Sequence, residues 1–401
     1  MNTPRDFDLV LAGATGFVGR LTAAHLATYA PDRLRIALAA RSSDKLDRVV
    51  EGLPESARSW PRLTVDLTDP RQSEELARRT AAVATTVGPY AVFGHELVAA
   101  CAAAGTHYAD LTGEVLFVRD VVQRHHDLAR ETRATIVPSC GFDSVPSDLG
   151  VMLAADAARV DGEGRLVEAT LHVRDARGGV SGGTIDSLRQ QVIAMRADSA
   201  TRRVVADPDA LADARTAYGR GPRSVGKDTQ TGRWHGPFPM SGYNTRVVRR
   251  SWSLTEGEAP LVYEEVADTS AGWKGAAAAV GIGLGMGGVA AAMAFPVTRR
   301  VVDRLLPSPG EGPNERTRAA GRFAVEVEAE TTTGAHYRAR VAADKDPGYD
   351  GTAVMLGESG LALAAGESAG RTGVLTPATA LGDALVDRLR SRGFTLEVTR
   401  W

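Results

Sequence analysis

Cysteine is scarce in this chain of 401 residues. Only Cys101 and Cys140 occur, and neither lies in a CxxC pair or at a metal-ligand spacing from a histidine. The sequence therefore predicts neither a disulfide framework nor a zinc site. We expect two reduced thiols and no bound metal.

An excess of charge of either sign is also lacking. The 47 Lys and Arg residues face 49 Asp and Glu residues, which leaves a net charge of -2. No overall field then attracts the protein to nucleic acid, so we expect small-molecule partners and no nucleic acid. A signal-peptide core is missing as well, since Arg5, Asp6 and Asp8 precede an apolar stretch that is too short for one. We expect a cytoplasmic protein.

The chain is long enough for two or three domains, and 43% of its residues are apolar. In residues 1–150, short β-like runs alternate with helical stretches, which predicts an α/β fold with a Rossmann-type parallel sheet. Residues 151–375 are predicted to form an α+β domain with a mainly antiparallel sheet. Residues 376–401 are expected to be a helix and a strand that pack back on the first domain. The expected strands are 8–12, 35–40, 63–66, 83–87, 107–110, 135–138, 167–174, 261–267, 323–331 and 335–342.

A glycine-rich turn follows the first expected strand. Its pattern is GxxGxxG, formed by Gly13, Gly16 and Gly19 ahead of a predicted helix. In such a turn the first glycine allows the bend, the second lets the backbone approach phosphate oxygens, and the third lets helix and strand pack closely. A turn of small residues without a ligand is the alternative. We favour a pyrophosphate-binding turn, with contacts from Gly13, Ala14, Thr15, Gly16, Phe17 and Val18.

The residue after the second expected strand bears on the choice of dinucleotide. Arg41 stands where an NAD-selective site has an Asp or Glu on the ribose 2′-hydroxyl. A guanidinium with Ser42 beside it suits a 2′-phosphate, because charge-assisted hydrogen bonds are strong. The sequence therefore predicts NADP; the alternative is a solvated Arg41 and a Ser42 that only caps the next helix. Asp66, after the third expected strand, is a candidate to face the adenine.

Four further stretches, together with GATGFVG at 13–19, carry a resemblance to a known family. They are TTVGPYAVFGHELVAACAAAGTHYADLTGE at 85–114, SCGFDSVPSDLG at 139–150, LPSPGEGP at 306–313 and GVLTPATALGDAL from 373. Together they resemble the saccharopine dehydrogenase-like oxidoreductases, in particular the subgroup that includes the trans-acting enoyl reductases. The resemblance implies a nicotinamide near the loops 87–90 and 140–144, with cofactor contacts from Val87, Gly88, Pro89, Cys140, Gly141 and Phe142.

Three side chains near these loops are candidate catalytic groups. Tyr90 and Tyr108 are the nearest hydroxyl donors by sequence for the protonation that follows hydride transfer. Asp143 is the third candidate. Its alternative role is to hold its own loop in place. For Tyr90 the alternative is a packing tyrosine after a Gly-Pro turn.

Residues 275–298 contain no charged residue, but six glycines and eight alanines make them only weakly hydrophobic. A membrane span is the weakest interpretation of this segment. The open alternatives are a buried or homodimer-forming segment and an apolar flap that contacts lipid as a peripheral membrane protein does.

The function implied by the resemblance is NADPH-dependent reduction of a carbon–carbon double bond in a hydrophobic acyl or polyketide thioester, within lipid biosynthesis. The substrate would be free or carrier-bound, with a polyketide synthase as partner. One alternative is an enzyme that acts on an amino acid-derived imine. The other is a non-catalytic, lipid-associated protein that binds NADP.

Overall fold

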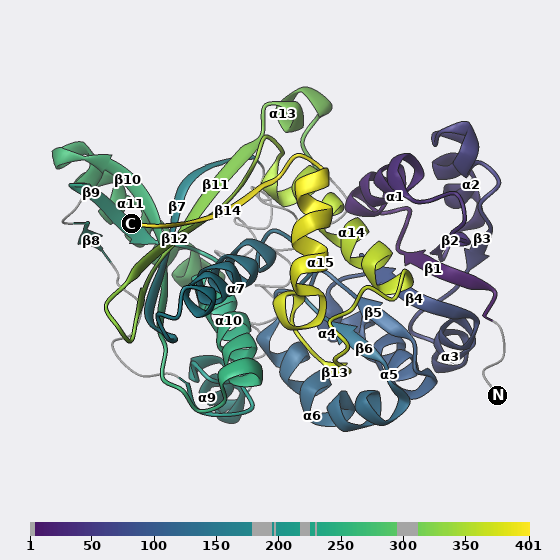
Figure 1. Cartoon of the computed structure of the whole chain (residues 1–401). Coiled ribbons are helices and arrows are strands. Elements are labelled where there is room, and N and C mark those ends of the chain that lie inside the picture. The colour runs from purple at the N-terminus through teal and green to yellow at the C-terminus, as the bar shows by residue number, and fades with distance from the viewer. Residues whose placement is uncertain (1–4, 179–194, 196–197, 217–224, 229–230, 295–311) are drawn as a thin grey trace.

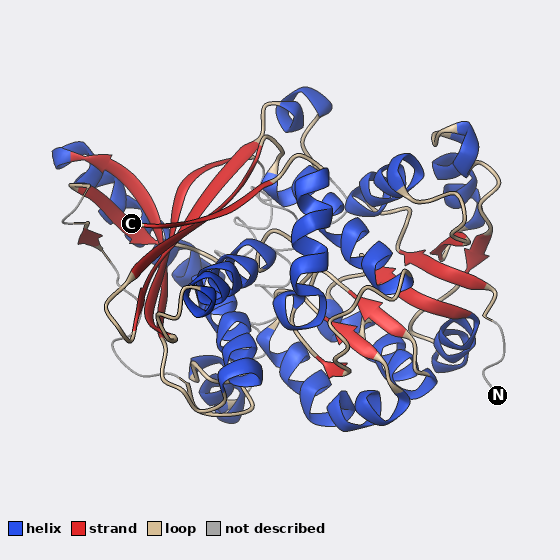
Figure 2. Cartoon of the chain, viewed as in Figure 1, coloured by secondary structure: helices blue, strands red, loops and turns tan. Residues whose placement is uncertain are grey.

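The computed structural model describes residues 5–178, 195, 198–216, 225–228, 231–294 and 312–401. Two sheets organise these residues, and helices lie between the sheets and around them (Figure 2). The expected α/β class, with a Rossmann-type sheet followed by a mainly antiparallel one, is confirmed.

The first sheet has seven strands in the order β13-β6-β5-β4-β1-β2-β3, and every neighbouring pair is parallel. Most of its strands are apolar runs buried on both faces, as in other parallel sheets, whereas the edge strand β3 is largely exposed. The carboxyl ends of all its strands therefore meet at one edge. The bounds are β1 Phe7–Ala12, β2 Ile36–Ala40, β3 Arg62–Thr64, β4 Thr80–Thr85, β5 His107–Ala109, β6 Thr135–Val137 and β13 Gly373–Val374.

The helices around this sheet come from two parts of the chain. The connecting helices are α1 Phe17–Tyr29, α2 Ser43–Glu51, α3 Pro70–Arg79, α4 Tyr90–Phe93, α5 His95–Ala104 and α6 Val115–Thr132, with the short helix η1 Glu55–Ala57. The later helix α14 Thr352–Ala364 packs against α1, β4 and β5. Residues 352–363 of α14 are all buried, as expected for a helix that is apolar on every side.

The second sheet also has seven strands, in the order β14-β12-β11-β7-β10-β9-β8. Only β7 and β10 pair in parallel among its described strands. Side chains alternate along β11: Phe323, Val325 and Val327 are buried in the core, whereas Glu326 and Glu328 pair with Arg174 on the opposite face. The bounds are β7 Leu166–Arg177, β8 Gly226–Lys227, β9 Arg233–Pro237, β10 Val262–Ala271, β11 Arg322–Thr331, β12 His336–Ala343 and β14 Thr395–Arg400.

Helices α7 and α10 lie between the two sheets (Figure 1). The two short strands β8 and β9 precede α10 in the chain. The remaining elements are α7 Val145–Val160, α9 Ser199–Ala206, α10 Ser241–Glu256, α11 Gly272–Ala294, α13 Glu315–Ala319, η2 Pro347–Gly351 and α15 Pro377–Ser391.

The chain passes between the sheets more than once. Helix α14 and β13, which fall in the stretch expected to form the second domain, belong to the first sheet and its helical layer. The C-terminal β14 pairs with β12 in the second sheet, whereas α15 packs on both α14 and α7. One apolar cluster consequently runs from Leu9 in β1 to Val327 in β11.

The uncharged segment 275–298 is helical as far as Ala294, and its last residues lie outside the described part. Helix α11 packs along β9 and β10 at the end of the second sheet farthest from the first sheet (Figure 1). No helix within the described residues is both long enough and apolar enough to cross a membrane.

Candidate functional site

The candidate site lies at the carboxyl edge of the first sheet, where β1 is flanked by β2 on one side and β4 on the other. The connection after β1 leads to β2 on one side, and the connection after β4 leads to β5 on the other side. The position between β1 and β4 is therefore the topological switch point, at which open α/β sheets bind ligands. The turn after β1 and the loops after β4, β5 and β6 all reach this edge.

The three glycines of the turn have different surroundings. Gly13 has φ +81°, and a Cβ there would lie 2.6 Å from Thr86 Oγ1. A Cβ on Gly19 would lie 2.1 Å from the Gly13 carbonyl oxygen, so this glycine lets α1 pack on the turn. A Cβ on Gly16 would meet only the Gly13 carbonyl oxygen, at 3.3 Å. The outer side of Gly16 is therefore open to a ligand.

Helix α1 begins directly at this open glycine. Gly16 is its N-cap and provides no side-chain cap, and the amide groups of Phe17 and Val18 have no acceptor within the described residues. Such amides, at the positive end of a helix, suit a pyrophosphate. Ala14 is buried below the turn, whereas Thr15, Phe17 and Val18 are partly exposed. The Phe17 ring packs edge-on against Tyr349, with the Arg318 guanidinium 5.5 Å from its centroid.

Arg41, Ser42 and Asp66 come together where β2 and β3 end. Arg41 is exposed and makes no hydrogen bond or ion pair within the described residues. Its charge helps to lower the pKa of Asp66, although hydrogen bonds from Thr68 are the larger cause. Ser42 caps α2, its Oγ accepting from the Lys45 amide at 3.4 Å. The capping that sequence reasoning offered as an alternative is present, and the Arg41 guanidinium remains available to a phosphate.

The loop after β4 borders the glycine turn directly. Thr86 Oγ1 donates to the Gly13 carbonyl at 3.0 Å, and the Val87 amide donates to Thr85 Oγ1 at 3.2 Å. Gly88 is exposed and Pro89 is the N-cap of α4. Backbone at Val87, Gly88 and Pro89 therefore lies beside the turn, where a dinucleotide would pass.

The expectation that Tyr90 donates a proton is not supported by its surroundings. Its side chain is only 4% exposed. The hydroxyl donates to the Thr85 carbonyl and accepts from the Leu111 amide, both at 3.1 Å. Burial raises the hydroxyl pKa well above its usual value. Tyr90 instead joins the loops after β4 and β5, which is the packing role given above as its alternative.

Tyr108 is likewise enclosed, within the core below the sheet edge. It is fully buried and its hydroxyl donates to Asp110 Oδ2 at 2.8 Å. Asp110 Oδ1 accepts from the amides of Thr112 and Ser139, both at 2.9 Å, so the carboxyl holds two loops together. Burial raises the pKa of Asp110 to about 7. We therefore withdraw Tyr108 as a proton donor, because its fully buried hydroxyl donates to the Asp110 carboxyl group.

The loop after β6 is packed by its neighbours. Cys140 is buried, and burial raises its thiol pKa far above the usual value, so it acts as a packing residue. A Cβ on Gly141 would lie 2.9 Å from Leu111 Cδ2. The Phe142 amide donates to Thr352 Oγ1 at 3.1 Å, and its ring packs edge-on against Phe323 of the second sheet.

Ser139, at the start of this loop, is a residue that sequence reasoning missed. Its φ of +70° is strained for a serine, and such strain is concentrated at functional sites. The buried Ser139 hydroxyl forms a hydrogen bond with the Tyr243 hydroxyl of α10. Met240, just before α10, lies near Gly113 on the next loop. Ser139 opens the stretch SCGFDSVPSDLG, but its neighbours Met240 and Tyr243 come from a segment about 100 residues later, outside the stretches that carry the family resemblance.

A second polar group lies below α10, between the sheets. Buried Glu265 of β10 accepts from Asn244 Nδ2 at 3.0 Å and from the Tyr263 hydroxyl at 2.9 Å. Burial raises the pKa of Glu265 to about 7. The partly exposed Asp143, the third catalytic candidate, acts electrostatically on both Glu265 and Tyr243. It therefore lies near these two residues.

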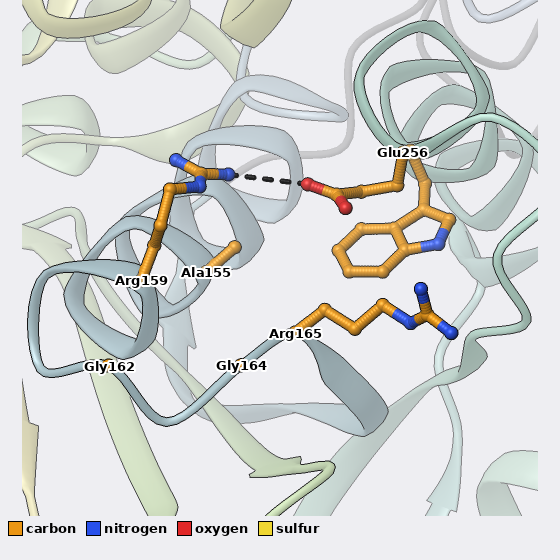
Figure 3. Close-up of a pocket in the computed structure, with 7 residues that line it drawn as sticks. Ala155, Arg159, Gly162, Gly164, Arg165 and Glu256 are labelled. Carbon is orange, nitrogen blue, oxygen red and sulfur yellow. Dashed lines mark hydrogen bonds and ion pairs between the residues drawn. The ribbon is translucent and has the colours of Figure 1, made fainter.

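The cavity in Figure 3 is separate from this site. It has a volume of about 330 Å³ and is lined by Ala155, Arg159, Gly162, Gly164, Arg165, Trp252 and Glu256. Arg159 Nη2 lies 3.3 Å from Glu256 Oε1 across it. Helix α7 reaches the sheet edge with its first residue but this cavity with its last turns, roughly 20 Å away. The cavity is therefore not part of the dinucleotide site.

Comparison with known proteins agrees with this geometry. The family model of the saccharopine dehydrogenase NADP-binding domain matches residues 9–137. A Mycobacterium tuberculosis relative is 44% identical over 99% of each chain. Proteins named trans-acting enoyl reductase from M. tuberculosis and M. leprae are 42% and 40% identical, over 99% of this chain and 98% of theirs.

The chain belongs to the saccharopine dehydrogenase-like oxidoreductases, in the trans-acting enoyl reductase subgroup. It is an NADP-binding oxidoreductase. The structure of saccharopine dehydrogenase from Saccharomyces cerevisiae matches it with a TM-score of 0.53 at 14% identity, over 98% of this chain and 99% of that one. This likeness concerns the fold alone. The predicted family, enzyme class and cofactor of this oxidoreductase are confirmed; the roles of individual site residues remain predictions.

Proposed function

We propose that this oxidoreductase reduces the carbon–carbon double bond of a hydrophobic acyl or polyketide thioester held on a carrier, in lipid biosynthesis. The observation that carries the proposal is full-length similarity, at 40% or more, to proteins named trans-acting enoyl reductase. The described surroundings of the sheet edge agree with such a substrate, because Leu111, Phe142 and Met240 supply apolar groups there.

The cofactor fits the residues present. The amides at the start of α1 and the open side of Gly16 would hold the pyrophosphate, and Arg41 would hold the 2′-phosphate. Bound NADPH supplies the hydride, which reduces the β-carbon of the enoyl thioester. The chain itself has to orient the substrate, stabilise charge on the thioester oxygen and deliver a proton to the α-carbon.

We assign the proton delivery to the Ser139 and Tyr243 hydroxyl pair. These hydroxyls are as buried as that of Tyr90, at 4% and 5% exposure, but they bond to each other, so within the described residues neither proton is held by a backbone carbonyl or a carboxylate. Both side chains lie at the loop after β6, and Asp110 fixes the Ser139 amide. Tyr243→Phe should lower turnover about a hundredfold while NADPH affinity is retained. Tyr90→Phe is the matched control, because it also removes one buried tyrosine hydroxyl; its turnover should stay within a few-fold of wild type. Equal rates for the wild type and Tyr243→Phe would refute the assignment.

The overall proposal is tested by NADPH oxidation with purified protein. Long-chain enoyl thioesters should be reduced, and mass spectrometry should find a product heavier by two hydrogens. A keto acid supplied with an amine tests the imine reductase alternative in the same assay. NADPH oxidation with the keto acid and amine alone, or with none of these substrates, would contradict enoyl reduction. Arg41→Asp should reduce selectivity for NADPH over NADH, and unchanged selectivity would remove Arg41 from the 2′-phosphate site.

A further inference from the structure

Helix α11 presents large apolar side chains to the outside. Trp273 is 77% exposed and Leu284 73%, and Val280 and Val289 are also exposed. Single exposed apolar residues are ordinary, but several on one helix indicate an interaction surface. Trp273, Val280 and Leu284 recur at spacings of seven and four residues, so they lie along one face of the helix. We call this face, with Ala277 between its first two members, the α11 ridge.

Small residues place the opposite face of α11 against the second sheet. Gly275 and Ala279 are buried, and a Cβ on Gly236 of β9 would lie 2.8 Å from the Ala279 carbonyl oxygen. Thr269 Oγ1 of β10 donates to the Gly275 carbonyl at 2.9 Å. At Gly275 and Ala279 the contact with the sheet therefore uses small residues and backbone, whereas Trp273, Val280 and Leu284 are left on the outside. The ridge lies far from the first sheet (Figure 1).

The charged residue at the start of α11 is basic. It is Lys274, and the sequence has no Asp or Glu between Asp268 and Asp303. Lys274 is exposed beside Trp273, with its Nζ 6.0 Å from the ring centroid. Tryptophan and lysine at the end of an apolar helix are typical of residues at the boundary between lipid headgroups and acyl chains. Basic residues without acidic neighbours are attracted to anionic lipids.

We propose that the α11 ridge binds the surface of an anionic phospholipid bilayer, with the helix lying in the plane of the interface. Trp273 and Leu284 then insert at the headgroup boundary, and Lys274 contacts headgroups. A second copy of the chain is the competing occupant. It is disfavoured because Lys274, beside the most exposed residue of the ridge, would become buried in a symmetric contact without any acidic residue nearby in sequence. The proposal does not depend on which substrate the enzyme reduces.

Vesicle flotation with the full-length protein tests the proposal. The protein should float with vesicles of phosphatidylcholine and phosphatidylglycerol, and much less with phosphatidylcholine alone or at high salt. Leu284→Glu should lower the partition coefficient about tenfold or more. Val160→Glu is the matched control, since Val160 is 84% exposed at the end of α7, and it should float as the wild type does.

Three outcomes would overturn the proposal. They are absence of flotation with either lipid, equal flotation of Leu284→Glu and wild type, and a wild-type dimer in light scattering that Leu284→Glu converts to a monomer without any lipid binding. The last outcome would mean that the ridge binds a second copy of the chain instead of a bilayer. NADPH binding measured on the same samples shows that each variant is folded. Enoyl thioester reduction is assayed separately without vesicles, so failure of this proposal is distinguishable from failure of the proposed function.

Discussion

The two tyrosines proposed from sequence as proton donors illustrate how burial decides the role of a side chain. Tyr90 and Tyr108 follow strands at the expected edge of the sheet, but their hydroxyls donate to the Thr85 carbonyl and to the Asp110 carboxyl group. Tyr243 comes from a helix more than 100 residues later and meets Ser139 at the same edge. In our proposal, the hydroxyl that acts at this edge therefore comes from a residue outside the stretches that carry the family resemblance.

Tyr90→Phe should destabilise the protein without disabling it. The substitution leaves the buried Leu111 amide without an acceptor, which costs about 1–3 kcal/mol in free energy of unfolding. Urea denaturation of the variant and the wild type measures this difference. A variant as stable as wild type would mean that the Tyr90 hydroxyl does not join the two loops.

The glycine turn allows a matched pair of variants. Gly16→Ala should weaken NADPH binding by about tenfold while lowering stability by only about 1 kcal/mol, because the added methyl lies on the open, ligand-facing side. Gly19→Ala should destabilise the fold itself, since its Cβ would clash with the Gly13 carbonyl. Fluorescence titration with NADPH and thermal denaturation separate the two effects. The same NADPH affinity in Gly16→Ala and wild type would argue against phosphate binding at this glycine.

Glu265 should make stability fall as pH rises. Burial raises its pKa in the folded state to about 7 from 4.5, so the folded protein holds a proton that the unfolded chain releases at lower pH. Its contribution is therefore fully present below about pH 4.5 and is lost as pH rises through 7. Glu265→Gln should remove this loss and gain stability over wild type, on the order of 3 kcal/mol, between pH 5 and 8.

Denaturant unfolding across this pH range measures the effect. The exposed Glu258→Gln serves as control and should follow the wild-type curve. A difference between Glu265→Gln and wild type that is independent of pH would show that Glu265 does not take up a proton on folding.

Among the elements, α10 connects most parts of the site. It carries Tyr243 and Asn244 to the sheet edge at its start and buries Arg250 farther along. The Arg250 guanidinium donates to the Leu211 carbonyl at 2.7 Å, to Asp213 Oδ1 at 2.8 Å and to the Val374 carbonyl of β13 at 2.5 Å. The Arg250 side chain therefore connects the loop before α10 to β13 of the first sheet.

Arg250→Ala should cost about 3 kcal/mol or more in free energy of unfolding, because buried carbonyl groups and one end of β13 lose their donor. Arg249→Ala is the control on the same helix. Arg249 is only partly buried and its hydrogen bonds to backbone carbonyls are 3.4 Å long, so its loss should cost about 1 kcal/mol or less. Equal losses for both variants in urea denaturation would contradict the special role of Arg250.

At the level of the complete chain, the two sheets depend on each other. Glu358 of α14 is fully buried and accepts from His25 of α1 at 2.8 Å and from Arg388 of α15 at 3.0 Å. The hydrogen bonds from His25 and from Arg392, whose Nε lies 2.6 Å from Glu358 Oε1, hold the pKa of Glu358 below its usual value despite burial. The helices α14 and α15, which pack on the first-sheet side, therefore follow most strands of the second sheet in the sequence.

A fragment of residues 1–150 should therefore not fold on its own. It contains the six expected strands but lacks α14 and β13, and it would expose the apolar surface that α14 covers. Circular dichroism should show no cooperative thermal transition for the fragment, whereas the full chain should unfold in one transition. A fragment that unfolds cooperatively and binds NADPH would establish an independent domain ending near residue 150.

The sequence by itself determined the fold class, the glycine turn, the NADP preference and the family, because these depend on local patterns: apolar runs bounded by turns, glycine spacing and one arginine after a strand. It did not determine which hydroxyl reaches the sheet edge or how α14, β13 and β14 are shared between the sheets. Those features depend on burial and on contacts between residues up to 333 positions apart, such as His25 and Glu358. Only the tertiary structure brings such pairs together, since no local periodicity encodes them.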